Sequence, residues 1–171
     1  MAQATFQGPV RSLSGFISQG PNTVVASAAT TAVTVANNAG KITNVIATSA
    51  ITLPAVNVTA NPSSSGPGQD PNTLNNLGAT YTFFLPATAV TVTITTASGD
   101  YLLGQIIIGP SGGGATSMFA ANGTSTTTIT LNGGTTGGIK GSYITVVAVA
   151  ANTYMVMGNL LGTATLVTPF S

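Results

Sequence analysis

Short runs in which apolar and polar residues alternate recur along most of this chain, and such runs predict β-strands. The clearest run is Tyr143-Ile-Thr-Val-Val-Ala-Val149, and after Ala-Ala-Asn-Thr a second run follows, Tyr154-Met-Val-Met-Gly158. The break between them has the length and turn chemistry of a hairpin loop. Both faces of the first run are apolar or weakly polar, so this strand needs cover on both sides. We therefore predict a β-hairpin over residues 140–158, near the centre of a sheet and ended by Gly158.

Similar runs on both sides of this hairpin predict roughly ten to twelve strands. Residues 23–53 read as a meander, and residues 90–95 as a strand with one threonine-lined face. Asn122-Gly123 predicts a hairpin between 116–121 and 124–131, because type I′ turns require positive φ at both central residues. The strand spacing favours an all-β fold, an antiparallel β-sandwich or barrel that is jelly-roll-like or β-tulip-like. We find no fixed-period repeat, which argues against a solenoid.

The chain divides into an extended N-terminal arm, residues 1–22, and a single β domain, residues 23–171. Proline at positions 9 and 21 disfavours helix in the arm. Each of its large apolar side chains would gain about 1.5 to 3 kcal/mol from full burial, so we expect the arm to dock, with a disordered or edge-strand terminus as the alternative. Residues 57–77 are rich in Pro, Gly, Ser and Asn and predict a long exposed loop, which is a second candidate contact region.

Charge is almost absent, because the 171 residues contain three Lys or Arg, two Asp or Glu and no His or Cys. Charged residues make up 3% of the chain, whereas about 25% is usual in a soluble domain. A surface this close to neutral offers little repulsion between copies. We expect much of it to lie against other subunits or a larger scaffold. Without cysteine, stability must come from packing and assembly, and the absence of Glu makes helix a minority state.

The residues that could support acid–base chemistry are Asp70, Asp100, Lys41 and Lys140. Both aspartates lie in predicted turns, where backbone hydrogen bonds explain them. We therefore predict that the protein is not an enzyme. A Ca²⁺ site needs about six to eight oxygen ligands and normally several carboxylates. We predict no metal and no cofactor, and a calcium site made of loop carbonyls is the weaker alternative.

Several binding classes find no support in the sequence. Residues 133–142 superficially resemble a phosphate-binding loop, but Lys140 does not follow the last glycine of the pattern and a strand comes next, so we predict a glycine-rich turn. Three dispersed cations form no phosphate track, which predicts no nucleic-acid binding. The apolar runs are far shorter than the ~18 residues of a membrane-spanning helix, and the first residues lack a signal-peptide pattern. We expect no membrane partner and no export, and read the sequons at Asn57 and Asn122 as loop residues.

Parts of both ends resemble a known group of proteins. These parts are Phe6-Gln-Gly-Pro-Val-Arg-Ser-Leu-Ser-Gly-Phe16, Gly141-Ser-Tyr-Ile-Thr-Val-Val147, Tyr154-Met-Val-Met-Gly-Asn159 and Thr168-Pro-Phe170. They are similar to small structural proteins of tailed bacteriophages, particularly marine podoviruses that infect cyanobacteria and similar hosts. In size and composition the chain resembles their capsid decoration or cement proteins. The resemblance implies a β-rich, commonly trimeric protein, made in the host cytoplasm, that clamps major capsid protein subunits on the outer surface of the head.

The resemblance also implies which residues make contacts. It assigns the capsid contacts to an extended N-terminal arm and the contacts between copies to the sheet. The capsid-contacting residues would be Phe6, Pro9, Arg11, Leu13 and Phe16. Arg11 would bond a partner's carboxylate, with a solvated side chain as the alternative. The alternative function is a tail-fibre or head-fibre module that binds a host glycan; it would place exposed aromatics on loops, and the chain has four Tyr and no Trp. A polysaccharide depolymerase is a third class, supported only by two isolated carboxylates.

Overall fold

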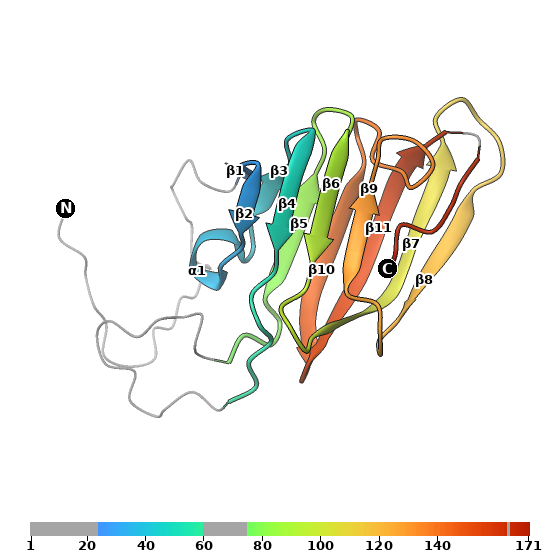
Figure 1. Ribbon diagram of the computed structural model, residues 1–171. Helices are drawn as coiled ribbons and strands as arrows, with labels where there is room; N and C mark the ends of the chain where they lie inside the picture. Colours follow the sequence, from blue (N-terminus) through green and yellow to red (C-terminus); the bar gives the residue numbers. More distant parts are fainter. Residues whose placement is uncertain (1–23, 60–74, 164) are drawn as a thin grey trace, which may run out of the picture.

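The computed structural model describes residues 24–59, 75–163 and 165–171, which form two sheets stacked face to face (Figure 1). Sheet A has seven strands, in the order β1 (Val24–Ala26), β3 (Ile42–Asn44), β5 (Thr80–Phe84), β10 (Tyr143–Ala150), β11 (Thr153–Gly162), β7 (Tyr101–Pro110) and β8 (Ser117–Asn122). Sheet B has four strands, in the order β2 (Thr30–Ala32), β4 (Thr48–Thr52), β6 (Thr91–Thr95) and β9 (Thr128–Leu131). The described residues contain one helix, α1 (Val35–Asn38), which is a single turn. The all-β class, the number of strands and the minor share of helix are confirmed.

The first six strands alternate between the two sheets. In sheet A, β1, β3 and β5 run parallel, and in sheet B, β2, β4 and β6 do the same. This part of the chain therefore winds as a short two-sided coil, and both the meander and the argument against a solenoid are wrong for it. The repeat was hidden because its turns differ in length: Ile42 follows its partner Val24 by 18 residues, whereas Thr82 follows Ile42 by 40.

The later strands make both sheets mixed. β10 is antiparallel to β5 and β11, and β8 to β7, but β11 and β7 run parallel over ten residues. In sheet B, β9 is antiparallel to β6. The expected antiparallel sandwich or barrel, jelly-roll-like or β-tulip-like, is therefore wrong in its strand directions. Side chains alternate between the two faces of a strand whether the neighbouring strand runs parallel or antiparallel to it. The sequence pattern therefore could not predict strand direction.

The hairpin over residues 140–158 is confirmed, and β10 is the middle strand of the seven in sheet A. Its turn contains Asn152 in the left-handed region, at φ 56°. The prediction that Gly158 ends the second strand is wrong, because β11 continues to Gly162. A Cβ at position 158 would lie 2.7 Å from the Tyr143 carbonyl oxygen. This glycine therefore lets β10 come close; it does not stop the strand.

The predicted Asn122-Gly123 hairpin is wrong in its partners. β8 pairs with β7 in sheet A, while β9 belongs to sheet B. The turn between them is held by the Asn122 side chain, whose Oδ1 accepts hydrogen bonds from the backbone N–H groups of Thr124, Ser125 and Thr126 at 3.0, 2.9 and 3.1 Å. The glycine-rich turn predicted before β10 is confirmed, and there Gly133 N donates to Gly137 O at 2.9 Å.

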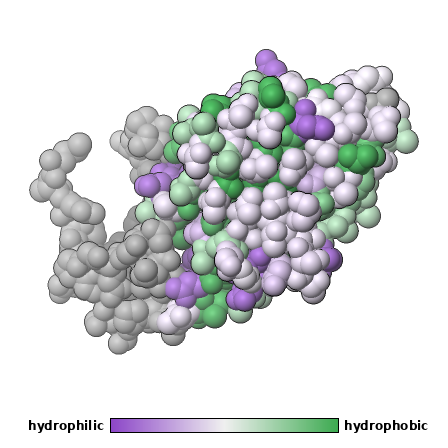
Figure 2. All heavy atoms as spheres, viewed as in Figure 1, coloured by the Kyte–Doolittle hydropathy of each residue, from purple (hydrophilic) through white to green (hydrophobic). Residues whose placement is uncertain are grey.

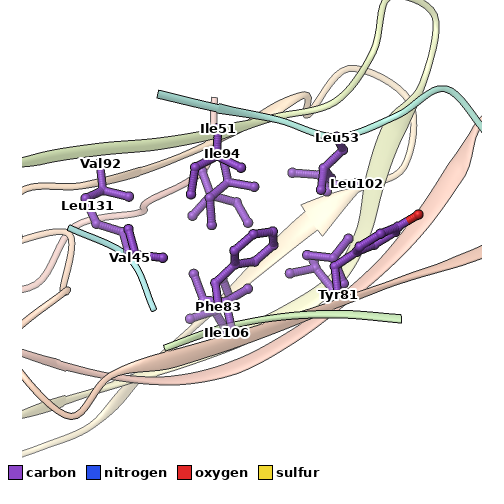
Figure 3. Packing of buried hydrophobic residues seen from close by; sticks show 14 of the residues in the cluster. Val45, Ile51, Leu53, Tyr81, Phe83, Val92, Ile94, Leu102, Ile106 and Leu131 are labelled. Carbon is purple, nitrogen blue, oxygen red and sulfur yellow. The ribbon is translucent and has the colours of Figure 1, made fainter. Parts of the chain in front are cut away.

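The core lies between the sheets and is built from alternate residues of their facing strands (Figure 3). Its largest fully buried side chains include Tyr81, Phe83, Ile94, Leu102 and Ile106. Each aliphatic or phenyl side chain buried here stabilises the fold by about 1.5 to 3 kcal/mol. Near the C-terminus, Phe170 forms a bridge with Ile129, so this segment lies along the free side of β9 (Figure 1).

Candidate binding surface

The outer face of sheet B is lined with threonine. Figure 2 views the molecule from this side, and the middle of the surface is pale, as expected for weakly polar residues. The predicted threonine face is confirmed for β6, where Val92 and Ile94 are buried beneath it, whereas Val90, which was also expected to face the core, is 67% exposed. The threonines of the three longer strands are Thr48, Thr52, Thr91, Thr93, Thr95, Thr128 and Thr130. Their hydroxyl groups can form hydrogen bonds with water, and they add no charge to the surface.

The outer face of sheet A is apolar. Among the described residues, nine of the fifteen exposed large apolar side chains belong to it. They alternate along the strands with core residues, as Tyr143 does with the buried Ile144. Met118 is the most exposed of them, at 63%. We define the outer apolar face as Val24, Ile42, Phe84, Leu103, Ile107, Met118, Tyr143, Met157 and Leu161.

Strand register aligns these residues in rows that cross the sheet. One row contains Met118, Ile107, Asn159, Tyr143, Phe84, Asn44 and Ala26. The next contains Ala120, Gln105, Met157, Thr145, Thr82, Ile42 and Val24. No described strand of either sheet contains Asp, Glu, Lys or Arg. The face is therefore broad, continuous and uncharged.

A shallow depression of about 210 Å³ lies in the middle of this face. It is lined by Gln105, Ile107, Tyr143, Thr145, Met157, Gly158 and Asn159. Two polar contacts across the strands satisfy groups in this region: Asn159 Nδ2 donates to the Tyr143 hydroxyl at 2.6 Å, and the Oγ1 atoms of Thr82 and Thr145 lie 3.2 Å apart. Such a hollow suits an apolar side chain, and its lining contains no nucleophile paired with a base.

The five residues assigned to capsid contact, Phe6, Pro9, Arg11, Leu13 and Phe16, lie outside the described residues, and so does Asp70. The part of the loop between 60 and 74 does too, although its ends are described. There Asn57 N donates to Asn76 Oδ1 at 2.8 Å, and Asn76 N donates to Asn57 O at 3.0 Å. Sequence reasoning predicted that the 143–149 strand needs cover on both sides and assigned contacts between copies to the sheet, but it did not identify the residues of the outer apolar face. Its signal was the second apolar face of the 143–149 run, which the structure leaves without cover.

Asp100 has a structural role. It is 4% exposed, and its Oδ2 accepts a hydrogen bond from Val56 N at 2.8 Å, which attaches the segment after β4 to the end of the sandwich. Burial raises the pKa of Asp100, and the bond from Val56 opposes this rise. The predicted turn is confirmed, because Asp100 N donates to Ala97 O at 3.1 Å, but the carboxylate bonds the distant Val56 and not a neighbour in the turn. No group of three or more His, Cys, Asp or Glu side chains gathers in the described part of the chain.

Two buried tyrosines pack edge to face nearby, with ring centroids 6.4 Å apart. The Tyr154 hydroxyl donates to Pro54 O at 2.7 Å, whereas the buried Tyr81 hydroxyl has no hydrogen-bond partner among the described residues. Burial raises the pKa of Tyr81 to about 12. It raises the pKa of Tyr154 further, with added repulsion from Tyr81 and Asp100. Both phenols therefore stay neutral near pH 7 and act as packing groups.

No helix in the described ranges is both long and apolar enough to span a membrane. The candidate site is a surface, the outer apolar face defined above. Comparison of the chain with protein-family models, with curated proteins and with solved structures found no match.

Proposed function

We propose that this chain is a structural virion protein that decorates and stabilises the capsid of a tailed bacteriophage by binding major capsid protein subunits on the outer surface of the head. The observation that carries the proposal is the outer apolar face, an uncharged sheet face that a free monomer would leave in water, which supports a protein that acts within an assembly. Contiguous exposed apolar patches on soluble proteins mark sites of association. The resemblance of both chain ends to phage structural proteins is the reason for proposing the phage capsid as the assembly.

The rest of the molecule fits a role in assembly. Decoration needs a stiff body whose modest contacts are repeated by the symmetry of the shell. Two stacked sheets with a shared core provide such a body. The sparse charge allows many copies to lie close together without mutual repulsion. In this proposal the N-terminal arm reaches the capsid through Phe6, Pro9, Arg11, Leu13 and Phe16.

No feature of the described residues specifically favours the alternative function, a fibre module that binds a host glycan. It leads one to expect exposed aromatic residues grouped on loops. The described aromatic side chains with substantial exposure are Phe84 and Tyr143, which lie on the neighbouring strands β5 and β10. We therefore keep this function as an outcome of the test below.

Deletion of residues 1–20 tests the proposal. The full chain should sediment with purified heads, and the deletion should abolish this binding while the strand signal in far-UV circular dichroism is unchanged. A chain with Phe6, Leu13 and Phe16 all changed to Ser provides a control of full length and should also lose binding. Retained binding would refute the arm assignment. Electron microscopy that locates the protein on the tail would instead support the fibre module.

A further inference from the structure

We infer that the outer apolar face of sheet A is the contact surface between two copies of this chain, which pack face to face through it. The inference deepens the proposed function, on which it rests for the view that the protein acts by assembly. It names the occupant of the face as a second copy, and its test needs no capsid.

Charge favours a second copy over a different protein. About 25% of the residues of an ordinary soluble domain are charged. A charge buried against an uncharged apolar face is left without a partner, at a cost of several kcal/mol. The described strands of sheet A contain no charged residue, and the two described lysines, Lys41 and Lys140, precede β3 and β10. A second copy therefore presents a face with no charge to desolvate.

Two polar pairs in the middle of the face are bonded before any partner arrives, and Gln105 is the polar side chain there that a partner would have to satisfy. Asn159 and Tyr143 bond each other at 2.6 Å, and Thr82 and Thr145 are in contact at 3.2 Å. Burial is penalised when polar groups lose water without gaining a hydrogen bond. Because these pairs stay intact when covered, an apolar partner face can lie on them with little loss.

The face is large enough for a stable pair. The neighbouring strands β5, β10, β11, β7 and β8 span roughly 24 Å at about 4.8 Å per strand. The eight residues of β10 extend roughly 26 Å at about 3.3 Å per residue. Two copies would thus bury roughly 1,200 Å² together, at the lower end of the range of about 1,200 to 2,000 Å² for specific interfaces. The edge strands β3 and β1 would add to this area.

The shape of the outer apolar face also suits packing against the same face of a second copy. The depression of about 210 Å³ lies among side chains that stand out from the sheet, including Met157 and Ile107. Methionine adapts its shape to an irregular hollow. One patch that contacts the same patch on a second copy forms a closed two-fold pair. This face therefore produces a dimer, whereas the trimer implied by the resemblance would need a different contact.

The test compares two disruptive variants of the full chain with two controls. Met157→Lys and Ile107→Lys each place a charge in the face, at positions 43% and 40% exposed, so the monomer should fold normally. Met157→Leu keeps the position apolar. Thr91→Lys adds the same charge to the outer face of sheet B, where Thr91 is exposed. Sedimentation equilibrium over a range of concentrations measures the association, and circular dichroism checks the fold of each variant.

We expect the wild type, Met157→Leu and Thr91→Lys to form dimers, and both disruptive variants to associate more weakly by on the order of a hundredfold or more. A wild type that is monomeric throughout overturns the inference. So does a dimer or trimer that persists in Met157→Lys and Ile107→Lys. A chain that does not dimerise but binds heads would refute this inference and leave the proposed function standing, and the reverse result would refute only the proposed function.

Discussion

The Tyr81 hydroxyl offers a precise test of the core. Tyr81 is 1% exposed, and its oxygen is buried without a hydrogen-bond partner among the described residues. Burying a hydroxyl without a compensating bond costs about 1 to 3 kcal/mol in protein mutational data. Tyr81→Phe removes that oxygen and keeps the ring, while the small void left behind loses about 1 kcal/mol or less. We therefore expect the unfolding free energy to rise, by about 1 kcal/mol.

Tyr154→Phe is the matched control, because it makes the same chemical change in the other ring of the edge-to-face pair. The Tyr154 hydroxyl is bonded to Pro54 O at 2.7 Å. Its removal breaks a hydrogen bond and leaves the carbonyl without this partner, so the unfolding free energy should fall by about 1 kcal/mol. The two variants should thus move stability in opposite directions.

Equilibrium unfolding in urea, followed by far-UV circular dichroism, measures both changes. All samples must have the same protein concentration, because self-association adds to apparent stability. Both phenols are neutral at pH 7, since burial raises their pKa values, so the comparison is free of ionisation. If Tyr81→Phe lowers stability as much as Tyr154→Phe does, the Tyr81 hydroxyl has a partner such as a buried water, and the reasoning fails.

Two further predictions concern the sandwich itself. Burial raises the pKa of Asp100 above its ordinary 3.8 in the folded state, so the folded chain binds this proton more tightly than the unfolded chain does. Thermal stability should therefore rise as the pH falls from that raised pKa towards 3.8. Asp100→Asn should remove this trend, and wild-type melting temperatures that fall over the same pH range would contradict it. Gly158→Ala should lower the unfolding free energy by about 1 to 3 kcal/mol, because its Cβ would meet backbone atoms of β10, whereas Gly112→Ala, with open space around it, should be nearly neutral in urea unfolding.

Local features of the fold were predictable from the sequence. The hairpin over 140–158, the threonine face of 90–95 and the glycine-rich turn before β10 each depend on neighbouring residues. Alternation reports two faces of a strand, and turn residues report φ, so both can be read within a few positions. The expectation that the protein is not an enzyme stays a prediction; it was based on residue counts, because two acidic residues and no His or Cys leave few catalytic arrangements.

The pairing of strands could not be predicted in this way, because it depends on residues that are far apart in the sequence. Nothing near Asn122 shows that the next strand crosses to the other sheet, and nothing near Val24 shows that it lies parallel to Ile42. The 21-residue segment over 57–77 lengthened one turn of the coil and removed any constant period. Strand direction and partner are set by how distant apolar faces pack together, and this cannot be read from a local pattern.

The sequence by itself determined that this protein is a β-rich, nearly uncharged chain whose central strand is apolar on both sides. Only the tertiary structure decided which side is covered. Ile144 and Val146 face the core, while Tyr143 and its neighbours in β11 and β7 form the outer apolar face. The physical reason is that sheet B can cover only one face of sheet A, so the apolar side chains of the other face stay exposed.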